Sequence, residues 1–363
     1  MMGKINIALA GVGNCASALL QGIEKYRKHP EESIGLMNNQ VGGYLPGDIN
    51  VVAAFDVDVR KVGFPLAEAL KASPNCTTEF WEVPSYPVKV NAAPIMDGVA
   101  EHMGDYQEER TFIPSPEEPC DVAKVLQDSG ADMLLLYLPV GSERAARFYA
   151  AACLEAGVAL INAIPVFIVS DQEWASAFEE KNLPLVGDDV KGQLGATVLH
   201  RALARLLEDR GITLDRTYQL NFGGNTDFLN MLNLDRVTTK KKSKTQAVQA
   251  ELKEPLHADD IHIGPSDYIP WLNDQKVCHI NLQGKGFGGV PVNLEIKLSV
   301  EDSPNSGGVM IDAIRCCKLA LDRGVGGALT SISAYTMKSP PLQYHDGEAF
   351  KMVEEYISGN RER

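Results

Sequence analysis

Short runs of apolar residues recur along the first half of the chain, with few polar residues inside them. They span residues 5–11, 51–58, 133–140, 158–165 and 183–189. Continuous apolar runs are typical of parallel strands, which are buried on both faces. The segments between them, such as 143–156, are rich in Ala, Arg and Glu and are helix-like. This alternation predicts an α/β fold with a Rossmann-type, doubly wound parallel sheet.

The pattern changes after about residue 214. Residues 277–282 and 292–300 alternate between apolar and polar, which is typical of antiparallel strands with one face in water or at an interface. Helix-like segments return at 311–321, ending at Gly324, and at 348–357. We therefore expect an α+β domain inserted into the nucleotide-binding domain, with the ranges 1–200 for the Rossmann domain, 201–305 for the insertion and 306–363 for the C-terminal return. The alternating strands need a partner for their second apolar surface, so we also expect an oligomer.

Composition and charge narrow the classes of function. The chain has 363 residues, and 34 Lys and Arg against 48 Asp and Glu give a net charge of −14. This charge disfavours a general nucleic-acid binder, because it repels phosphate backbones. No apolar run approaches the roughly 20 residues of a membrane span, and the N-terminus lacks the cleavage site of a signal peptide. The seven cysteines are scattered without a C-x-x-C pair, which favours the cytoplasm over a disulfide framework or a structural zinc.

A glycine-rich loop follows the first predicted strand. Gly11 and Gly13 stand where a G-x-G-x-x-G motif would begin, and Ala16 replaces the third glycine. Glycines there allow backbone N–H groups to approach a pyrophosphate at a helix N-terminus, although the pair is also compatible with a simple turn. Asp56 ends the second strand, beyond an inserted loop at 26–47, and is the candidate acid for the ribose hydroxyls. An acid at this place favours NAD over NADP.

Candidate chemistry lies from residue 187 onward. Residues 187–191 end a buried strand with two adjacent acids and a lysine, and residues 221–227 form a small polar loop before a helix. Such a loop can offer N–H groups to a phosphate, but a turn that only caps the helix is an equal alternative. The lysine-rich run 240–244 is by default a solvated face. Clustered lysines can also neutralise a phosphate, and their mutual repulsion can lower the pKa of one of them toward that of a base.

Lys285, Lys338 and Asp302 stand apart from these clusters. Each lysine is by default a surface residue, and Asp302 precedes a helix as an N-cap does. The histidines between 257 and 279 lack carboxylates at metal-ligand spacing. The sequence therefore identifies no metal site and leaves open whether a divalent or monovalent cation assists.

Seven blocks run through these segments: GVGNCAS, LPVGS, GDDVKGQ, NFGGNTDF, KKKSKTQAV, IGPSDYIPWLNDQK and SVEDSPNSGGVMIDAIRCCKLA. Together they closely resemble the myo-inositol-1-phosphate (inositol-3-phosphate) synthase family in its shorter prokaryotic form. The resemblance extends from about residue 5 to residue 338. It implies an enzyme that binds NAD on a Rossmann domain, converts glucose 6-phosphate to inositol 1-phosphate and assembles as a homotetramer through the inserted domain.

The resemblance also implies functional residues, each at a matching motif position. The cofactor contacts would be Gly11, Gly13, Asn14, Ser17, Asp56 and Asp189, the last beside the nicotinamide. The substrate and phosphate contacts would be Asn221, Asn225, Lys244 and Gln193. The catalytic residues would be Lys240, Lys285, Lys338, Asp189 and Asp302. One departure is Gly192, where relatives usually carry Ser, so that a backbone N–H would replace a hydroxyl.

The implied reaction is a redox-neutral cyclisation of D-glucose 6-phosphate to 1D-myo-inositol 3-phosphate (L-myo-inositol 1-phosphate). Oxidation at C5 acidifies C6, the C6 enolate attacks the C1 aldehyde in an aldol closure, and the hydride returns to C5. Developing oxyanions need cations and proton transfers need amines, and lysines can supply both. Lys338 and Lys240 would act at the C5 oxygen, Lys285 at the C1 oxygen and Lys244 on the phosphate, while the substrate's own phosphate takes the C6 proton.

Three alternatives stay open at this point. The same chemistry could act on a different sugar phosphate, or the chain could be a plain NAD-dependent dehydrogenase with net turnover of its cofactor. A non-catalytic NAD-sensing protein would bind NAD and be indifferent to loss of the lysines, and the complete lysine set disfavours it. The segments 26–47 and 84–116 receive no function from the sequence.

Overall fold

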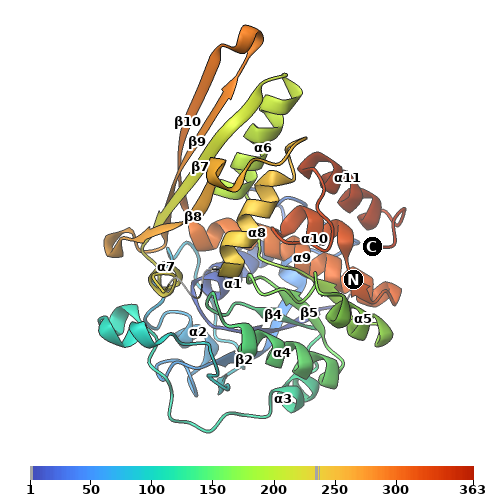
Figure 1. Cartoon of the computed structure of the whole chain (residues 1–363). Coiled ribbons are helices and arrows are strands. Elements are labelled where there is room, and N and C mark those ends of the chain that lie inside the picture. The colour runs from blue at the N-terminus through green and yellow to red at the C-terminus, as the bar shows by residue number, and fades with distance from the viewer. Residues whose placement is uncertain (1–2, 234–235, 237) are drawn as a thin grey trace.

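A seven-stranded sheet and a four-stranded sheet form the framework of the chain (Figure 1). The computed structural model describes residues 3–233, 236 and 238–363, and the side chains of 238–243, 265 and 266 lie outside that description. The strands of the larger sheet are β1 (Ile5–Ala10), β2 (Ile49–Asp56), β3 (Val90–Ala92), β4 (Met133–Leu136), β5 (Ala159–Asn162), β6 (Pro184–Val186) and β11 (Gly327–Ala328). Those of the smaller sheet are β7 (Thr213–Gly223), β8 (Ile261–Tyr268), β9 (Gln275–Lys285) and β10 (Pro291–Glu301). The helices are α1 (Asn14–Lys28), α2 (Leu66–Ala69), α3 (Val122–Ser129), α4 (Glu143–Ala156), α5 (Gln172–Glu180), α6 (Ala196–Asp209), α7 (Thr226–Asn230), α8 (Thr238–Gln249), α9 (Asp302–Arg323), α10 (Thr330–Thr336) and α11 (Asp346–Ile357).

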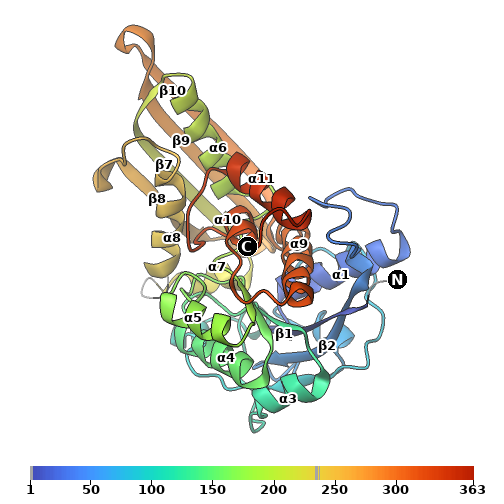
Figure 2. The ribbon, with the colours of Figure 1, turned by 90° about the vertical axis from the view of Figure 1, so that its right-hand side faces the viewer.

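Every pairing in the larger sheet is parallel, with the strand order β11-β6-β5-β4-β1-β2-β3. Figure 2 shows α1 and α9 on one side of this sheet and α3, α4 and α5 on the other. Along β1, Ile7 and Leu9 pack into the core under α1 and α9, while Ala8 and Ala10 pack into the core under α3 and α4. Because both faces are covered, the positions from Ile7 to Ala10 are all apolar, and the only polar residue of this strand is the partly exposed Asn6. The predicted doubly wound α/β fold is confirmed.

The smaller sheet has the order β10-β9-β7-β8, with β9 antiparallel to both of its neighbours and β7 parallel to β8. Helix α6 covers one face through Ala204 and Leu207, which join a core with Ile280 and Leu282 of β9. Exposure alternates residue by residue along β10. The alternating strands predicted at 277–282 and 292–300 are therefore confirmed. The three predicted domain ranges remain a prediction, and α6 begins at Ala196, shortly before the predicted insertion.

Two predicted elements differ in length from those in the structure. The helix predicted at 311–321 is α9, which begins at Asp302 and ends as expected at Gly324, a residue with a φ of 66°. The strand predicted at 183–189 is the shorter β6, because the backbone turns at Asp189 with a φ of 64°. This turn brings the two acids of the 187–191 block out of the sheet at its carboxyl edge.

The two segments without a predicted function pack against elements near that edge. Arg315 of α9 is buried and donates hydrogen bonds to the carbonyls of Asn38 and Asn39, which fastens the 26–47 loop to α9. In the 84–116 segment, Nε2 of His102 lies 3.0 Å from the carbonyl oxygen of Leu229 in α7. Among the described residues, no helix is long and apolar enough to cross a membrane.

Candidate functional site

A cavity of about 200 Å³ lies at the carboxyl edge of the parallel sheet, where the smaller sheet meets it. Its lining comes from the residues after β1, β4, β5 and β6, from β7 and β9, and from the first turn of α9. In doubly wound folds, ligands bind outside the carboxyl ends of the strands, at the point where the strand order reverses. The predicted site residues that line this cavity are Gly13, Asn14, Asp189, Asn221, Asn225, Lys244, Asp302 and Lys338.

The glycine-rich loop is built as the sequence predicts. Gly11 has a φ of 97°, and a Cβ on this residue would lie 2.5 Å from the carbonyl oxygen of Tyr137. Helix α1 follows at once, and its N-cap Gly13 has no side-chain capping bond and no acidic residue in the first turn beyond it. The first N–H groups of α1 therefore lack a side-chain partner at the cavity, which is the arrangement that binds a pyrophosphate.

Two of the predicted cofactor contacts support this loop from outside the cavity lining. Asp56 ends β2 as expected, but its Oδ2 accepts a hydrogen bond from the backbone N–H of Val12 (2.7 Å) and its Oδ1 one from that of Val57. Ser17 is buried within α1, and its Oγ accepts a hydrogen bond from Nε2 of Gln21 (3.3 Å). Both residues thus stabilise the loop and its helix, and a direct contact with the cofactor stays a prediction.

Asn14 lines the cavity and also fastens a second segment to it. Its Oδ1 accepts hydrogen bonds from the backbone N–H groups of Cys76 (2.7 Å) and Thr77 (3.0 Å). This contact holds Pro74 and Asn75 in the cavity lining. A short stretch after α2, which the sequence analysis did not assign, therefore belongs to the site.

Lys338 and Asp189 form one ion pair in the cavity. Nζ of Lys338 lies 2.7 Å from Oδ1 of Asp189 and donates a hydrogen bond to the carbonyl of Val190 (2.6 Å). The side chains of Lys338 and Asp189 are only 13% and 4% exposed. The segments after β6 and after α10 thus place a cation and an anion side by side in the cavity that the glycine-rich loop also lines.

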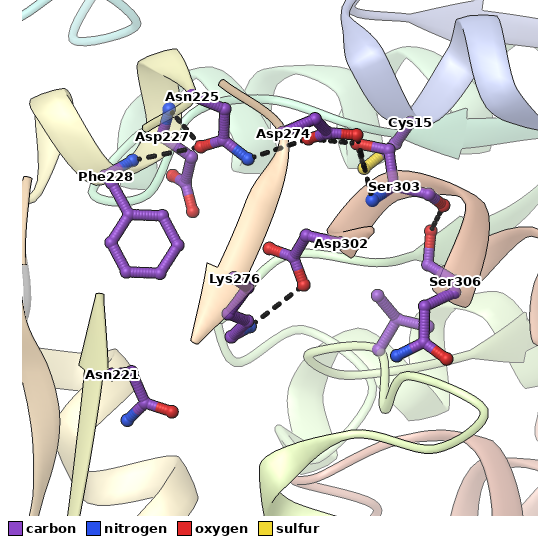
Figure 3. A network of polar contacts seen from close by, with 12 residues as sticks. Cys15, Asn221, Asn225, Asp227, Phe228, Asp274, Lys276, Asp302, Ser303 and Ser306 are labelled. Atoms are coloured by element: carbon purple, nitrogen blue, oxygen red, sulfur yellow. Dashed lines mark hydrogen bonds and ion pairs between the residues drawn. The ribbon is translucent and has the colours of Figure 1, made fainter. Parts of the chain in front are cut away.

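Lys276 and Asp302 form a second ion pair in the same cavity (Figure 3). Nζ of Lys276, at the start of β9, lies 3.0 Å from Oδ1 of Asp302, at the start of α9. Burial opposes the charge of Lys276, but the nearby carboxylates of Asp302, Asp227 and Asp189 outweigh it and raise the pKa of this lysine. Lys276 is therefore an ammonium at neutral pH.

Sequence reasoning did not single out Lys276 and predicted Lys285 instead, but of these two lysines only Lys276 lines the cavity. Lys285 lies at the opposite end of β9, is 59% exposed and pairs with Asp215 at 3.1 Å, away from the cavity. Lys276 is the last residue of the block IGPSDYIPWLNDQK, so the signal that could have identified it was within the recognised motif. The structure gives Lys276, not Lys285, a place beside Asp302.

The polar loop after β7 caps a helix, as one of its two alternative predictions says, while phosphate binding by this loop stays a prediction. Asn225 caps α7, because its Oδ1 accepts hydrogen bonds from the N–H groups of Asp227 and Phe228, and it also lines the cavity. Asn221 is fully buried in β7, and its Nδ2 donates to the carbonyl of Gly264 (2.7 Å). Lys244 of α8 is only 4% exposed and reaches the same cavity, so it does not belong to a solvated face.

Two remaining predicted residues have other positions. Gln193 does not reach the described cavity lining, since its Nε2 donates to the carbonyl of Gly35 (2.9 Å) in the 26–47 loop. Lys240 belongs to α8, but its side chain lies outside the described part of the structure. Gly192 lines the cavity, and a Cβ on it would lie 2.5 Å from Nδ2 of Asn305. In this chain Asn305 therefore occupies space that a larger residue at 192 would need.

A metal centre is not visible in the described part of the chain. Among the residues at 3–233, 236 and 238–363, no group of three or more His, Cys, Asp or Glu side chains could hold a metal ion. Four ionisable groups of the cavity form two lysine–carboxylate pairs, Lys276 with Asp302 and Lys338 with Asp189.

Comparisons with known proteins identify the family. The sequence model described as myo-inositol-1-phosphate synthase matches residues 195–303. The inositol-3-phosphate synthase of Mycolicibacterium smegmatis is 52% identical to this chain, over 98% of this chain and 99% of its own length. The chain belongs to the myo-inositol-1-phosphate synthase family. The inositol-3-phosphate synthase of Corynebacterium glutamicum is similar as well, with 51% identity over 97% of this chain and 98% of its own length.

A solved structure supports the fold of this myo-inositol-1-phosphate synthase family member. The crystal structure of a myo-inositol-1-phosphate synthase-related protein from Thermotoga maritima covers 98% of both chains, with a TM-score of 0.81 and 24% identity. This likeness concerns the fold alone. The fold described above is therefore shared with that protein.

Proposed function

We propose that this chain is an inositol-3-phosphate synthase that converts D-glucose 6-phosphate to 1D-myo-inositol 3-phosphate, with NAD as its cofactor. The observation that carries this proposal is the presence of two lysine–carboxylate pairs and Lys244 in one cavity beside a glycine-rich loop. A plain dehydrogenase needs a single site of proton transfer at the oxidised carbon. Ring closure needs cations at C5, at C1 and at the phosphate, and this cavity provides three lysines.

The residues around the glycine-rich loop fit NAD. Gly13 and the N-terminus of α1 would hold the pyrophosphate, because their N–H groups lack side-chain caps and no acidic residue in the first turn repels the anion. Asn14 would hold the loop against the segment at 74–77. Asp189, which also lines the cavity, would lie beside the nicotinamide. When bound, NAD would supply the hydride acceptor at C5 and return the same hydride, which leaves no net oxidation.

Lys338 would exchange the proton of the C5 hydroxyl and stabilise the C5 oxygen. Asp189 holds Nζ of Lys338 at 2.7 Å and can balance its charge while the proton moves. The sequence assigns Lys240 to the same carbon.

Lys276 would take the role at C1 that the sequence analysis gave to Lys285. Its raised pKa keeps it protonated, so it acts as a cation and proton donor to the oxygen that forms when the C6 enolate attacks the aldehyde. Asp302 orients this ammonium at 3.0 Å. Lys244, buried in the cavity wall, would neutralise the phosphate, which itself takes the C6 proton.

Phosphorus NMR of the reaction mixture tests the proposal. Purified protein is incubated with glucose 6-phosphate and NAD in amounts far below that of the substrate. Inositol 3-phosphate in many-fold excess over NAD is the expected result. Accumulation of reduced nicotinamide would identify a plain dehydrogenase, and turnover of another sugar phosphate with glucose 6-phosphate left unchanged would move the proposal to that substrate.

Assembly into a homotetramer through the smaller sheet is part of the same proposal. Tyr218 is 39% exposed on β7, and Phe222 is half-buried on the same face, opposite to the face that α6 covers. Apolar side chains on an open sheet face favour a second sheet against them. Light scattering should give four times the chain mass of 39.4 kDa, and a monomer in dilute solution would exclude this assembly.

A further inference from the structure

Asp274 is a buried carboxylate that no predicted site includes. It lies in the turn before β9, two residues before Lys276, and is 1% exposed. It lies behind the described cavity lining and so does not reach the space in which a substrate would bind. A buried charge of this kind requires partners, and its partners all belong to elements that form the cavity.

Three donors converge on the carboxylate of Asp274 (Figure 3). Oδ1 accepts hydrogen bonds from Nδ2 of Asn225 (3.0 Å) and from Oγ of Ser303 (3.0 Å). Oδ2 accepts a hydrogen bond from the backbone N–H of Ser303 (3.2 Å). In addition, the carbonyl oxygen of Asp274 accepts the backbone N–H of Asp302 (2.9 Å).

These contacts replace a missing cap on α9. The residue before this helix, Glu301, makes no side-chain capping bond. The first two N–H groups of the helix, those of Asp302 and Ser303, instead point to Asp274. Asp274 therefore caps α9 from a neighbouring segment, and a negative charge there also suits the positive end of the helix.

Asp274 connects the two segments that carry the second ion pair, Lys276 and Asp302. Asp274 precedes Lys276 by two residues along the chain, and it binds the backbone of Asp302 and of Ser303. The 3.0 Å separation of Lys276 and Asp302 thus depends on one buried side chain that touches both segments. Ser303 extends this link to the glycine-rich loop, because Sγ of Cys15 donates to its Oγ (3.8 Å).

We propose that Asp274 is the positioning residue of this site: it holds Asp302 against Lys276 and ties both to the cap of α7. The expected effect on turnover rests on the proposed function, whereas the arrangement of Asp274, Asp302 and Lys276 is independent of it. Burial and the charge of Asp302 raise the pKa of Asp274 to about 6, so it is mainly ionised at neutral pH. An ionised carboxylate suits this place, because the hydrogen-bond partners of its two oxygens are all donors.

Asp274→Asn tests this proposal with little change of shape. The new amide must direct its NH₂ at one of the donors. Either the bond from the backbone N–H of Ser303, which caps α9, or the bonds from Asn225 and from Oγ of Ser303 are therefore lost. We expect kcat for cyclisation to fall about 10- to 100-fold, because displacement of a reacting group such as Lys276 by up to about 1 Å has an effect of this size. KM for glucose 6-phosphate and the dissociation constant of NAD should change little. Asp215→Asn, which removes a carboxylate–lysine pair at the other end of β9, is the matched control and should keep normal kinetics.

A second measurement does not depend on catalysis. The lysines are reductively methylated with ¹³C-labelled methyl groups and observed by NMR. The Lys276 signal is identified by its absence in Lys276→Arg, and its shift with pH gives the pKa. If Asp302 moves away in Asp274→Asn, Lys276 loses the largest of the charges that oppose the effect of burial, and its pKa should fall from the value in the native chain. Asp302→Asn should give the same fall.

These two measurements separate failure of the positioning proposal from failure of the proposed function. A wild-type protein that does not cyclise glucose 6-phosphate, together with a lowered Lys276 pKa in Asp274→Asn, supports the positioning role and rejects the proposed function. A normal kcat and an unchanged Lys276 pKa in Asp274→Asn overturn the positioning role. If Asp274→Asn does not fold, Ser303→Ala removes one of its hydrogen bonds, and an unchanged Lys276 pKa and kcat in that variant overturn the proposal equally.

Discussion

Nζ of Lys191 lies 3.0 Å from Oδ1 of Asp346, and this buried ion pair joins the loop after β6 to the first turn of α11. Arg201 of α6 completes the network, because it is fully buried and contacts both Asp346 (3.1 Å) and Glu251 (2.5 Å). Burial lowers the pKa of Lys191 to about 8, and Asp346 offsets part of that effect. The network connects the three segments that carry the cavity residues Asp189, Lys244 and Lys338.

Arg201→Met should destabilise the fold strongly. The substitution leaves Glu251 without its guanidinium partner in the interior, and removal of one partner of a buried pair typically costs about 3–5 kcal/mol. Arg205→Met, four residues later on the same helix, removes an exposed pair with Asp209 and should change stability little. Urea unfolding at a fixed protein concentration measures the free energy of unfolding of both variants. Equal midpoints for the two variants would show that the buried network does not stabilise the chain.

His200 should make the protein sensitive to mild acid. It is fully buried between Oγ1 of Thr217 (2.8 Å) and Oε1 of Gln219 (3.2 Å), and burial lowers its pKa to about 4. The unfolded chain, with an ordinary value of about 6.5, binds more protons in this range, so stability falls as the pH falls from about 6.5 to about 4. The loss from this one group reaches at most about 3 kcal/mol.

The check on His200 is a comparison of pH profiles. Unfolding midpoints in urea are measured between pH 4 and pH 7, for the native chain and for His200→Gln, which retains a polar group near Thr217. The native chain should lose more stability than the variant over this interval. Parallel profiles would assign the acid sensitivity to other groups, such as the Asp346 carboxylate, whose pKa is lowered by Lys191 and Arg201 despite its burial.

Lys276→Met and Lys285→Met distinguish the structure from the sequence-based assignment. Lys276 lies in the cavity with Asp302, so its loss should lower the rate of cyclisation about 10²- to 10⁴-fold, the range for a positioned proton donor. Lys285 is exposed at the distant end of the strand, so its loss should leave the rate near normal. Initial rates of inositol phosphate formation by the two variants show which lysine acts in the reaction. The reverse order of effects would restore Lys285 to the site.

The case of these two lysines shows what the sequence could and could not provide. The parallel strands were visible because both of their faces are buried, as the separate packing of Leu9 and Ala10 demonstrates. The sequence offered Asp302 as the cap before α9, but Asp302 is the first residue of this helix, and the carboxylate that caps the helix, Asp274, comes from another segment. Which end of β9 faces the cavity depends on the pairing of Lys276 with Gly223 and of Lys285 with Thr213. Local spacing holds no information on that pairing.

Gly11→Ala and Gly13→Ala should separate folding from cofactor binding. At Gly11, with a φ of 97°, a methyl group would lie 2.5 Å from the Tyr137 carbonyl oxygen, so the variant should lose at least about 1–2 kcal/mol of stability along with NAD binding. At Gly13 the φ is −94° and no atom lies within 4 Å of a Cβ, so Tm should stay near normal. Because Gly13 lines the cavity at the N-terminus of α1, the added methyl group should still weaken NAD binding. Thermal melts without NAD and calorimetric titration with NAD measure the two effects, and an unchanged affinity in Gly13→Ala would falsify the placement of the pyrophosphate on this loop.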